Sequence, residues 1–454
     1  MGRWLAYGLA LFPLQALACA LPPSILLTLP TGYYMAGAAV TVAVTALIGA
    51  AAPRLPAMQA AVFWDGRHRL PEILPAFAGF LGFLALIFFG LFGAGDPLHN
   101  LLTLIFWSGV WVALPLASML LGNLWHPINP WRAPVRIARV LLGRNGGAGL
   151  ARLGHWPAVL GLAGFFWFEL ISTSPDDPRV LAQVALAYWA VVFIAAVAEG
   201  EEWLEQGEFL SVYFAFLAKV APIWKDRATR RLMRGWPGTQ VLAMPALTPS
   251  AVIFVTVALA GLTFDGLSGT FWWLALIGQN PLEFAGRSAV QGVNTAGLIA
   301  AWVLTTGAIL GAFAMGRRLA RQTGPFWRDL SPAMLAFLAI AAGYHAAHYL
   351  TILLTTGQYA IFALNDPFFR GDAWLGLPPF YISFGFLTDR GTMTLIWNLQ
   401  FAAILCAHIL AVILALKLSA RGGPARAILH LPMTALMVGY TVLGLWLLAS
   451  PSGA

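Results

Sequence analysis

Ten long apolar segments follow one another along the chain. A helix needs about 20 consecutive apolar residues to cross the hydrocarbon core of a bilayer, and each segment is close to that length. The segments therefore predict an all-α fold, a polytopic transmembrane helical bundle of about ten spanning helices. They cover residues 33–51, 74–94, 101–121, 157–173, 180–198, 250–268, 291–315, 332–356, 392–416 and 431–449.

The composition supports a membrane protein. Of the 454 residues, 60% are hydrophobic and 10% are charged, whereas soluble domains carry about 25% charged residues. These values argue against a soluble enzyme, a disordered chain and a nucleic-acid-binding protein, and they predict the lipid bilayer as the main partner. Two cysteines, Cys19 and Cys406, do not make a disulfide framework or a thiolate metal site.

The amino-terminal segment, residues 1–20, has the pattern of a secretory signal peptide. Arg3 precedes an apolar stretch, and small residues follow at Ala16, Ala18 and Ala20. An uncleaved first hydrophobic segment is the alternative, although Pro13 disfavours a regular helix. We therefore expect residues 1–20 to be a signal peptide and residues 21–454 to form a single helical membrane domain.

The basic residues are concentrated in alternate connections between the apolar segments. Of 26 Lys and Arg residues, 21 lie in these connections. Since basic residues mark cytoplasmic loops, the distribution predicts a bacterial inner-membrane protein whose mature N-terminus and C-terminus both face outward. The basic residues of these connections are Arg54, Arg67, Arg69, Arg132, Arg136, Arg139, Arg144, Arg152, Lys219, Lys225, Arg227, Arg230, Arg231, Arg234, Arg317, Arg318, Arg321, Arg328, Lys417, Arg421 and Arg426.

Three connections are longer than simple turns. The cytoplasmic connection 199–249 begins with an acidic segment, Glu199 to Glu208, and continues with an apolar stretch too short to span. This stretch predicts an interfacial or partly re-entrant helix. The acidic segment is either a solvated face or a docking surface for a protein partner. The outer loops 264–290 and 357–391 are expected to roof an outward-facing pocket.

Several connections contain a short polar residue followed by proline. An Asx, Ser or Thr residue at the N-cap and a proline at the next position are typical of a helix start. We therefore expect helices to begin at these pairs. The outer pairs are Asp96-Pro97, Asp177-Pro178, Asn280-Pro281 and Asp366-Pro367, and the cytoplasmic pairs are Thr248-Pro249 and Ser331-Pro332.

Five ionisable residues lie within the apolar segments: Glu169, Asp265, His345, His348 and His408. Ionisable side chains inside a membrane are costly and mark functional sites by default. His345 and His348 are three residues apart, so they share one helix face. Together with His408 on the next segment they form a candidate metal site for zinc or another transition metal. Alternatively, these histidines have a structural role or pass protons along a relay.

Two carboxyl groups are placed near the outer ends of their segments. Glu169 stands among aromatic residues and needs a partner, for which Arg287 or a histidine is available. Asp265 precedes Gly266 and could instead only end a helix. With His348, the two carboxyl groups are the candidate catalytic residues of a single outer cavity.

Six stretches give the chain a family resemblance. They are NPWRA (129–133), EEWLEQGEFLSVYF (201–214), TFDGLSG (263–269), AHYLTILLTTGQ (347–358), NDPFFRG (365–371) and LPMTALMVGYTVLGLWLL (431–448). In these stretches, in their order, the chain resembles bacterial polytopic membrane proteins of the fenitrothion hydrolase family, which are membrane-bound organophosphate hydrolases.

The resemblance implies hydrolysis of a lipophilic phosphotriester by water. Such chemistry usually uses a metal-activated hydroxide. His348, together with Glu169, Asp265, His345 or His408, would then supply the metal ligands, and a small lipophilic substrate would reach the site from the lipid. The resemblance does not supply an established catalytic motif.

Two other classes of function agree with the same residues. A transporter, or a protein that handles a metal ion or small ligand, would use intramembrane His and Glu residues as binding or relay groups. A haem-binding or accessory subunit of a larger membrane complex would use histidine ligands and the acidic segment Glu199 to Glu208.

Overall fold

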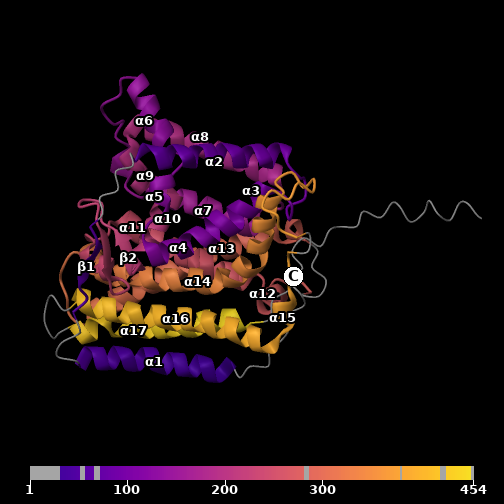
Figure 1. Cartoon of the computed structure of the whole chain (residues 1–454). Helices are drawn as coiled ribbons and strands as arrows, with labels where there is room; N and C mark the ends of the chain where they lie inside the picture. Colours follow the sequence, from indigo (N-terminus) through magenta and orange to yellow (C-terminus); the bar gives the residue numbers. More distant parts are fainter. Residues whose placement is uncertain are drawn as a thin grey trace, which may run out of the picture.

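The computed structural model describes residues 31–51, 57–65, 72–280, 286–378, 381–419 and 426–450. The predicted signal peptide, residues 1–20, lies outside the described residues. The described part is an all-α polytopic bundle whose long helices run side by side across the molecule (Figure 1). A small sheet and several short helices lie at the ends of the long helices.

Each of the ten predicted segments corresponds to a helix or to a continuous helical run. The run at 101–121 joins α3 (Leu101–Leu104), the π-helical η1 (Ile105–Ala113) and α4 (Leu114–Leu121). The other nine are α1 (Thr31–Ala51), α2 (Ile73–Phe92), α7 (Trp156–Ile171), α8 (Pro178–Glu199), α11 (Pro249–Ser268), α13 (Arg287–Leu319), α14 (Phe326–Asn365), α16 (Arg390–Ser419) and α17 (Arg426–Ala449). Within the described residues, eight of these ten are long and apolar enough to cross a membrane, and α1 and α7 contribute shorter apolar stretches.

The connections at the two ends of the bundle differ in charge. We call the end that contains residues 122–155, 200–248 and 320–325 the basic end, and the end that contains residues 93–100, 172–177, 269–280 and 366–378 the acidic end. In Figure 1 the basic end lies at the left, where α6, α9, β1 and β2 are labelled, and the acidic end lies at the right, near α12 and α15.

The short elements are divided between these ends. The basic end contains α5 (Trp125–Ile128), α6 (Arg132–Leu141), η2 (Leu150–Leu153), η3 (Glu201–Trp203), α9 (Leu204–Gly207), α10 (Phe209–Leu217), η4 (Ala218–Val220) and η5 (Thr239–Ala243). The acidic end contains α12 (Phe271–Leu276) and α15 (Gly385–Thr388). Parts of the predicted loops 264–290 and 357–391 are helical. These loops contain α12 and α15, and the ends of α11 and α14 extend into them.

A three-stranded antiparallel sheet at the basic end was not predicted. Its strands β1 (Ala60–Trp64), β2 (Ile223–Lys225) and β3 (Leu232–Gly235) are arranged in the order β1-β3-β2. β2 and β3 belong to the long connection that follows α10, and β1 comes from the connection between α1 and α2. The sheet therefore joins two parts of the chain that are far apart in sequence.

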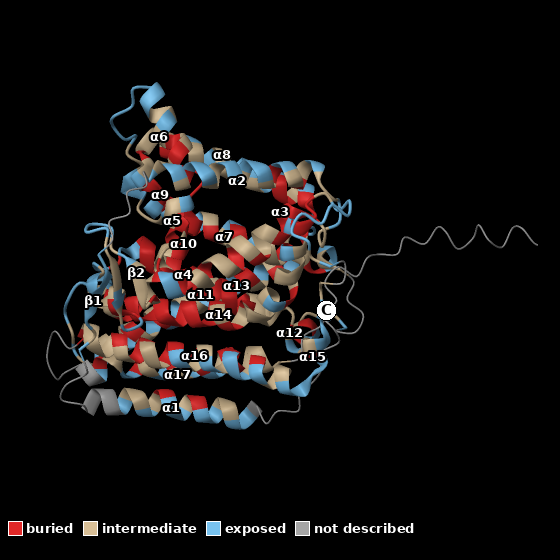
Figure 2. Ribbon diagram, viewed as in Figure 1, coloured by how far each residue is buried: buried red, intermediate tan, exposed pale blue. Residues whose placement is uncertain are grey.

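The helices α14 and α11 form the centre of the bundle. In their spanning windows, 78% of the residues of α11 and 89% of those of α14 are buried inside the protein. The central helices are mainly red in Figure 2, whereas α1 and α2 at the periphery are largely pale or tan. α14 packs against α16, η1, α11 and α10. Polar side chains on α14 and α11 therefore lie inside the protein instead of facing lipid.

The predicted short helix after the acidic segment is α10, and it enters the bundle. Seven of its nine residues are buried, and it packs against α7, α14, α4 and α5. Glu208 caps its first turn by accepting hydrogen bonds from the backbone amides of Leu210 and Ser211 at 2.8 and 2.7 Å. Of the two predicted forms, interfacial and partly re-entrant, the packing agrees with the re-entrant one.

Helix starts at the polar-proline pairs were predicted correctly in two cases. Asp177 and Thr248 are the N-caps of α8 and α11, and each is followed by a proline. The prediction was wrong for Ser331-Pro332, because α14 begins five residues before Ser331 and Pro332 lies inside it. It was also wrong for Asp96, since Asn100 caps the helix that follows, and for Asp366, which ends α14. The pair Asn280-Pro281 falls partly outside the described residues.

Candidate functional site

One face of α14 carries the central polar residues. His345, His348 and Tyr349 are three and four residues apart, so their side chains project from the same side of the helix. This part of α14 lies between α11 and η1, which also contact it. The helix therefore presents three polar rings to its neighbours in the centre of the bundle.

His348 and Asp265 form a pair across α14 and α11. The Nε2 atom of His348 lies 2.8 Å from Oδ2 of Asp265, and 30% and 17% of the two side chains are exposed. Asp265 stands one turn before the end of α11, which places the pair toward the acidic end. Because both side chains keep some exposure, the pair is accessible from a cavity and is not sealed inside the core.

Tyr349 links this pair to Glu169 on α7. Its hydroxyl lies 3.0 Å from Oδ2 of Asp265 and 3.2 Å from Oε1 of Glu169. A hydroxyl has one hydrogen and can donate it to only one of the two carboxyl groups at a time. Oε2 of Glu169 is buried without a hydrogen-bond partner among the described residues. Glu169 is therefore an incompletely satisfied buried group, of the kind that is concentrated at functional sites.

Arg287 supports Glu169 through the backbone. The guanidinium group donates to the carbonyl oxygens of Glu169 and Ser172 at 2.8 and 3.3 Å. It therefore satisfies the last carbonyls of α7 instead of forming an ion pair with the Glu169 carboxyl group. The predicted pairing of Glu169 with Arg287 is found only in this backbone form.

The His348–Asp265 pair faces a cavity of about 220 Å³ between α11, α14, α16 and α17. Apart from the pair, its walls are mainly apolar, and the hydroxyl-bearing residues among them are Thr270, Tyr344 and Ser450. The lining residues are Leu262, Asp265, Gly266, Gly269, Thr270, Tyr344, Ala347, His348, Ile404, Gly444, Leu447, Leu448 and Ser450. The predicted roof contributes through residues 265–270, whereas none of the lining residues belongs to 357–391.

His345 points to a different neighbour. It is fully buried, and its Nδ1 atom lies 3.1 Å from the hydroxyl of Tyr213 on α10. The ring of Trp111, from the π-helical segment η1, stacks on Tyr213 and meets His345 edge-on. π-Helical turns occur frequently at functional sites. The Nε2 atom of His345 and the indole nitrogen of Trp111 have no hydrogen-bond partner among the described residues.

The three predicted metal-ligating histidines have separate surroundings. His408 is fully buried, and its Nδ1 atom lies 2.8 Å from the Ile404 carbonyl oxygen of its own helix. In the described part of the chain, no three His, Cys, Asp or Glu side chains are grouped so that they could hold a metal ion. A zinc or other divalent metal site at His345, His348 and His408 therefore stays a prediction.

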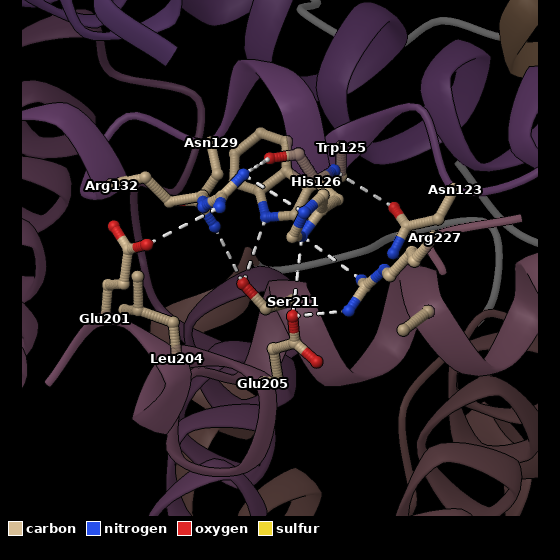
Figure 3. A pocket seen from close by; sticks show the side chains of 11 residues that line it. Asn123, Trp125, His126, Asn129, Arg132, Glu201, Leu204, Glu205, Ser211 and Arg227 are labelled. Atoms are coloured by element: carbon tan, nitrogen blue, oxygen red, sulfur yellow. Dashed lines mark hydrogen bonds and ion pairs between the residues drawn. The ribbon is translucent and has the colours of Figure 1, made fainter. Parts of the chain in front are cut away.

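A second polar cluster lies at the basic end, around His126 (Figure 3). The His126 ring is held between Arg132 and Arg227, whose nitrogens approach its Nε2 and Nδ1 atoms to 3.0 and 3.1 Å. Burial, followed by the positive charges of Arg227, Arg132 and Lys225, lowers the pKa of His126 to about 3. The adjacent cavity, of about 20 Å³, has room for little more than one water molecule.

Carboxyl groups of the predicted acidic segment neutralise these arginines. Glu201 lies 3.7 Å from Arg132 and also pairs with the neighbouring Arg136, and Glu205 pairs with Arg227 at 2.6 Å. Glu199 accepts hydrogen bonds from the backbone amides of Gly149, Leu150 and Ala151. The segment is thus largely engaged within the protein, which neither of the two predicted alternatives anticipated. A protein partner at Glu199 to Glu208 stays a prediction.

The sequence did not single out Tyr349, Tyr213 or Trp111. Aromatic residues are frequent in apolar helices, so nothing in the composition distinguishes these three. Tyr349 was recognisable only by its spacing, four residues after His345 and next to His348.

No protein-family model, no curated protein and no solved structure matches the chain.

Proposed function

We propose that the protein is a membrane-embedded hydrolase with an acid–base site that opens toward the acidic end. The observation that carries this proposal is the His348–Asp265 pair, which is 2.8 Å apart and lines a mainly apolar cavity of about 220 Å³. A largely apolar pocket with a few convergent polar groups is the usual form of a small-molecule site.

The pair has the geometry that prepares a histidine as a general base. An ionised carboxylate only accepts hydrogen bonds, so the hydrogen between the two groups belongs to Nε2 of His348. The lone pair of the neutral imidazole is then on Nδ1. Asp265 orients the ring and stabilises the imidazolium that forms when Nδ1 takes up a proton, as the buried aspartate does in hydrolytic triads.

In the proposed reaction, Nδ1 of His348 removes a proton from a water molecule in the cavity. The oxygen of that water forms a bond to the phosphorus of a neutral phosphotriester, and the bond from phosphorus to the aryloxy group breaks. The proton then passes from His348 to the departing oxygen, which leaves as a phenol. General acid–base catalysis of this kind contributes about 10²- to 10⁴-fold to a rate.

The substrate class rests on the walls of the cavity and on the resemblance to fenitrothion hydrolases. Leu262, Ile404, Leu447 and Leu448 favour a lipophilic molecule, which would be concentrated in the bilayer around the protein. A charged substrate would have to leave its hydration shell to reach the same walls, at a large free-energy cost.

We further propose that the basic end faces the cytoplasm of a bacterial inner membrane. The concentration of arginines in the connections at this end supports the orientation. The acidic end, the cavity and both termini of the mature chain would then face outward.

The test is hydrolysis by the purified protein in liposomes. Release of a coloured phenol from a lipophilic aryl phosphotriester is measured against liposomes without protein. The proposal predicts protein-dependent release that saturates with substrate. Release at the background rate over a range of lipophilic phosphotriesters would contradict it.

A proton-coupled transporter is the second candidate. It is favoured by the continuous contact of Glu169, Tyr349, Asp265 and His348, which resembles the carboxyl and histidine relays of membrane transporters. Proteoliposomes loaded with a pH-sensitive dye would test it. Acidification that depends on an added small solute supports transport, and unchanged internal pH with ongoing phenol release supports the hydrolase.

A further inference from the structure

A short arm at the basic end extends from the side of the bundle. We call residues 132–153 the α6 arm; it consists of α6, the following loop and η2. Figure 1 shows α6 beyond α2 and α8, at the edge of the molecule. The long helices run from one end of the bundle to the other, so the arm projects sideways, within the plane that a membrane surface would occupy.

The beginning of the arm is fixed to the protein. Ala133 and Val135 are buried, and α6 packs against α2, α8 and η3. The guanidinium group of Arg139 donates to the carbonyl oxygen of Val197 at 2.8 Å, near the end of α8. The carboxylate of Glu199 accepts from the backbone of η2 at 2.8 Å. The arm is therefore held in position at both of its ends.

The tip of the arm is apolar and uncovered. Val140, Leu141 and Leu142 are 76%, 80% and 65% exposed. Three consecutive large apolar residues in water would be a liability for solubility and would favour aggregation. Because hydrogen bonds hold the arm on both sides of this tip, the three side chains cannot turn inward without breaking them.

The same edge of the bundle has the apolar surface of spanning helices. On α8, Val191 and Ile194 are 67% and 68% exposed, and on α2 Leu74 is 54% exposed. α2 and α8 are long and apolar enough to span a membrane, so these side chains face lipid. The apolar tip of the arm belongs to the same side of the protein as this lipid-facing surface.

We propose that the α6 arm is an in-plane membrane anchor, which inserts Val140, Leu141 and Leu142 into the lipid leaflet at the basic end. Amphipathic helices that lie in the interface combine an apolar face with basic residues, as this arm does. Arg144, which follows the tip and donates to the carbonyl oxygen of Ala198 at 3.4 Å, and Arg152 in η2 are both exposed, so their positive charge lies where anionic lipid headgroups would attract it.

The test places one fluorescent label on the arm of the full-length protein. In a Cys19→Ser, Cys406→Ser background, Leu141→Cys carries an environment-sensitive dye, and Asn145→Cys in the same loop is the matched control. The proteins are reconstituted into liposomes that contain anionic lipid and lipids with a nitroxide near the top of the acyl chain. Circular dichroism checks that both variants keep the helical fold.

The anchor predicts a blue-shifted emission at Leu141, quenching by the nitroxide lipid and loss of quenching by aqueous iodide. Asn145 should show the reverse pattern. If both labels are equally accessible to iodide and neither is quenched by lipid, the proposal is overturned. Efficient disulfide formation between Leu141→Cys copies without lipid quenching would also overturn it, since a second copy of the chain would then cover the tip.

Discussion

Nε2 of His348 and Oδ2 of Asp265 lie 2.8 Å apart, on helices that are far from each other in the sequence. The contact brings a base and its orienting carboxylate together at the wall of an apolar cavity. The geometry of the pair depends on the packing of the two helices. The polar face of α14 sets the position of His348, and the last turn of α11 sets the position of Asp265.

The hydroxyl of Tyr349 supports the carboxyl groups of Asp265 and Glu169. Tyr349→Phe keeps the ring packing but removes the donor, so it should lower the free energy of unfolding by about 1–3 kcal/mol. It should also slow phosphotriester hydrolysis, because Asp265 loses one of its two contacts. Thermal unfolding followed by tryptophan fluorescence and the phenol-release assay measure the two effects.

Tyr440→Phe is the matched control for this variant. Its hydroxyl is also buried, lies close to the hydroxyl of Thr263 and donates to the carbonyl oxygen of Leu259, but Tyr440 does not line the cavity. This variant should lose stability and keep its rate of hydrolysis. Equal loss of hydrolysis in both variants would show that Tyr349 acts only through stability.

Glu169→Gln separates the two candidate functions. The amide keeps the size of the side chain and can still accept from Tyr349, but it cannot exchange a proton. Because Glu169 does not line the cavity, hydrolysis by the variant should stay close to the wild-type rate. A proton-coupled transporter would instead lose its proton flux. Abolished hydrolysis in a folded Glu169→Gln protein would contradict the proposed mechanism, in which Glu169 takes no part.

Glu201 is expected to stabilise the basic end. Its carboxylate accepts two hydrogen bonds from Arg136, at 3.1 and 2.5 Å, and lies 3.7 Å from Arg132. Glu201→Gln should cost about 1–3 kcal/mol of stability, since charge-assisted bonds to partly buried arginines are lost. Glu202→Gln is the control, because Glu202 makes no ion pair within the described part of the chain. Equal melting temperatures of the two variants would contradict this role.

His126 should make the protein sensitive to acid. Its pKa in the folded protein is about 3, below the ordinary value of 6.5. Between these two values the unfolded chain binds a proton that the folded protein does not bind, so the stability falls as the pH drops below 6.5. Between neutral pH and about pH 4, the melting temperature of His126→Gln should therefore fall less than that of the wild type. The same loss in both proteins would rule out this contribution.

The bundle could be predicted because spanning helices have a strong signature. Each needs an uninterrupted apolar run, and all ten runs correspond to helical segments of the structure. Helix starts were less predictable, since the same Asx-Pro pair caps α8 at Asp177 but follows the last turn of α14 at Asp366. In that second place the Asp366 side chain accepts from the amides of Arg370 and Gly371, which makes a turn.

The site could be predicted in part. Ionisable residues are rare in apolar segments, so Glu169, Asp265 and His348 were candidates from the sequence alone. Their connection through Tyr349 was not predictable, because it depends on how α7, α11 and α14 pack. The different partners of His345 and His348 were also not predictable, because the two histidines share one helix face. His345 contacts Tyr213 only because α10 packs against α14.

The most direct test of the proposed function compares two histidine variants at the acidic end. His348→Gln removes the proposed base, whereas His99→Gln alters a second His–Asp pair, with Asp96 at 2.6 Å, that does not line the cavity. We predict that phosphotriester hydrolysis in liposomes falls about 10²- to 10⁴-fold in His348→Gln and is unchanged in His99→Gln. Wild-type hydrolysis that survives in a folded His348→Gln protein would contradict it.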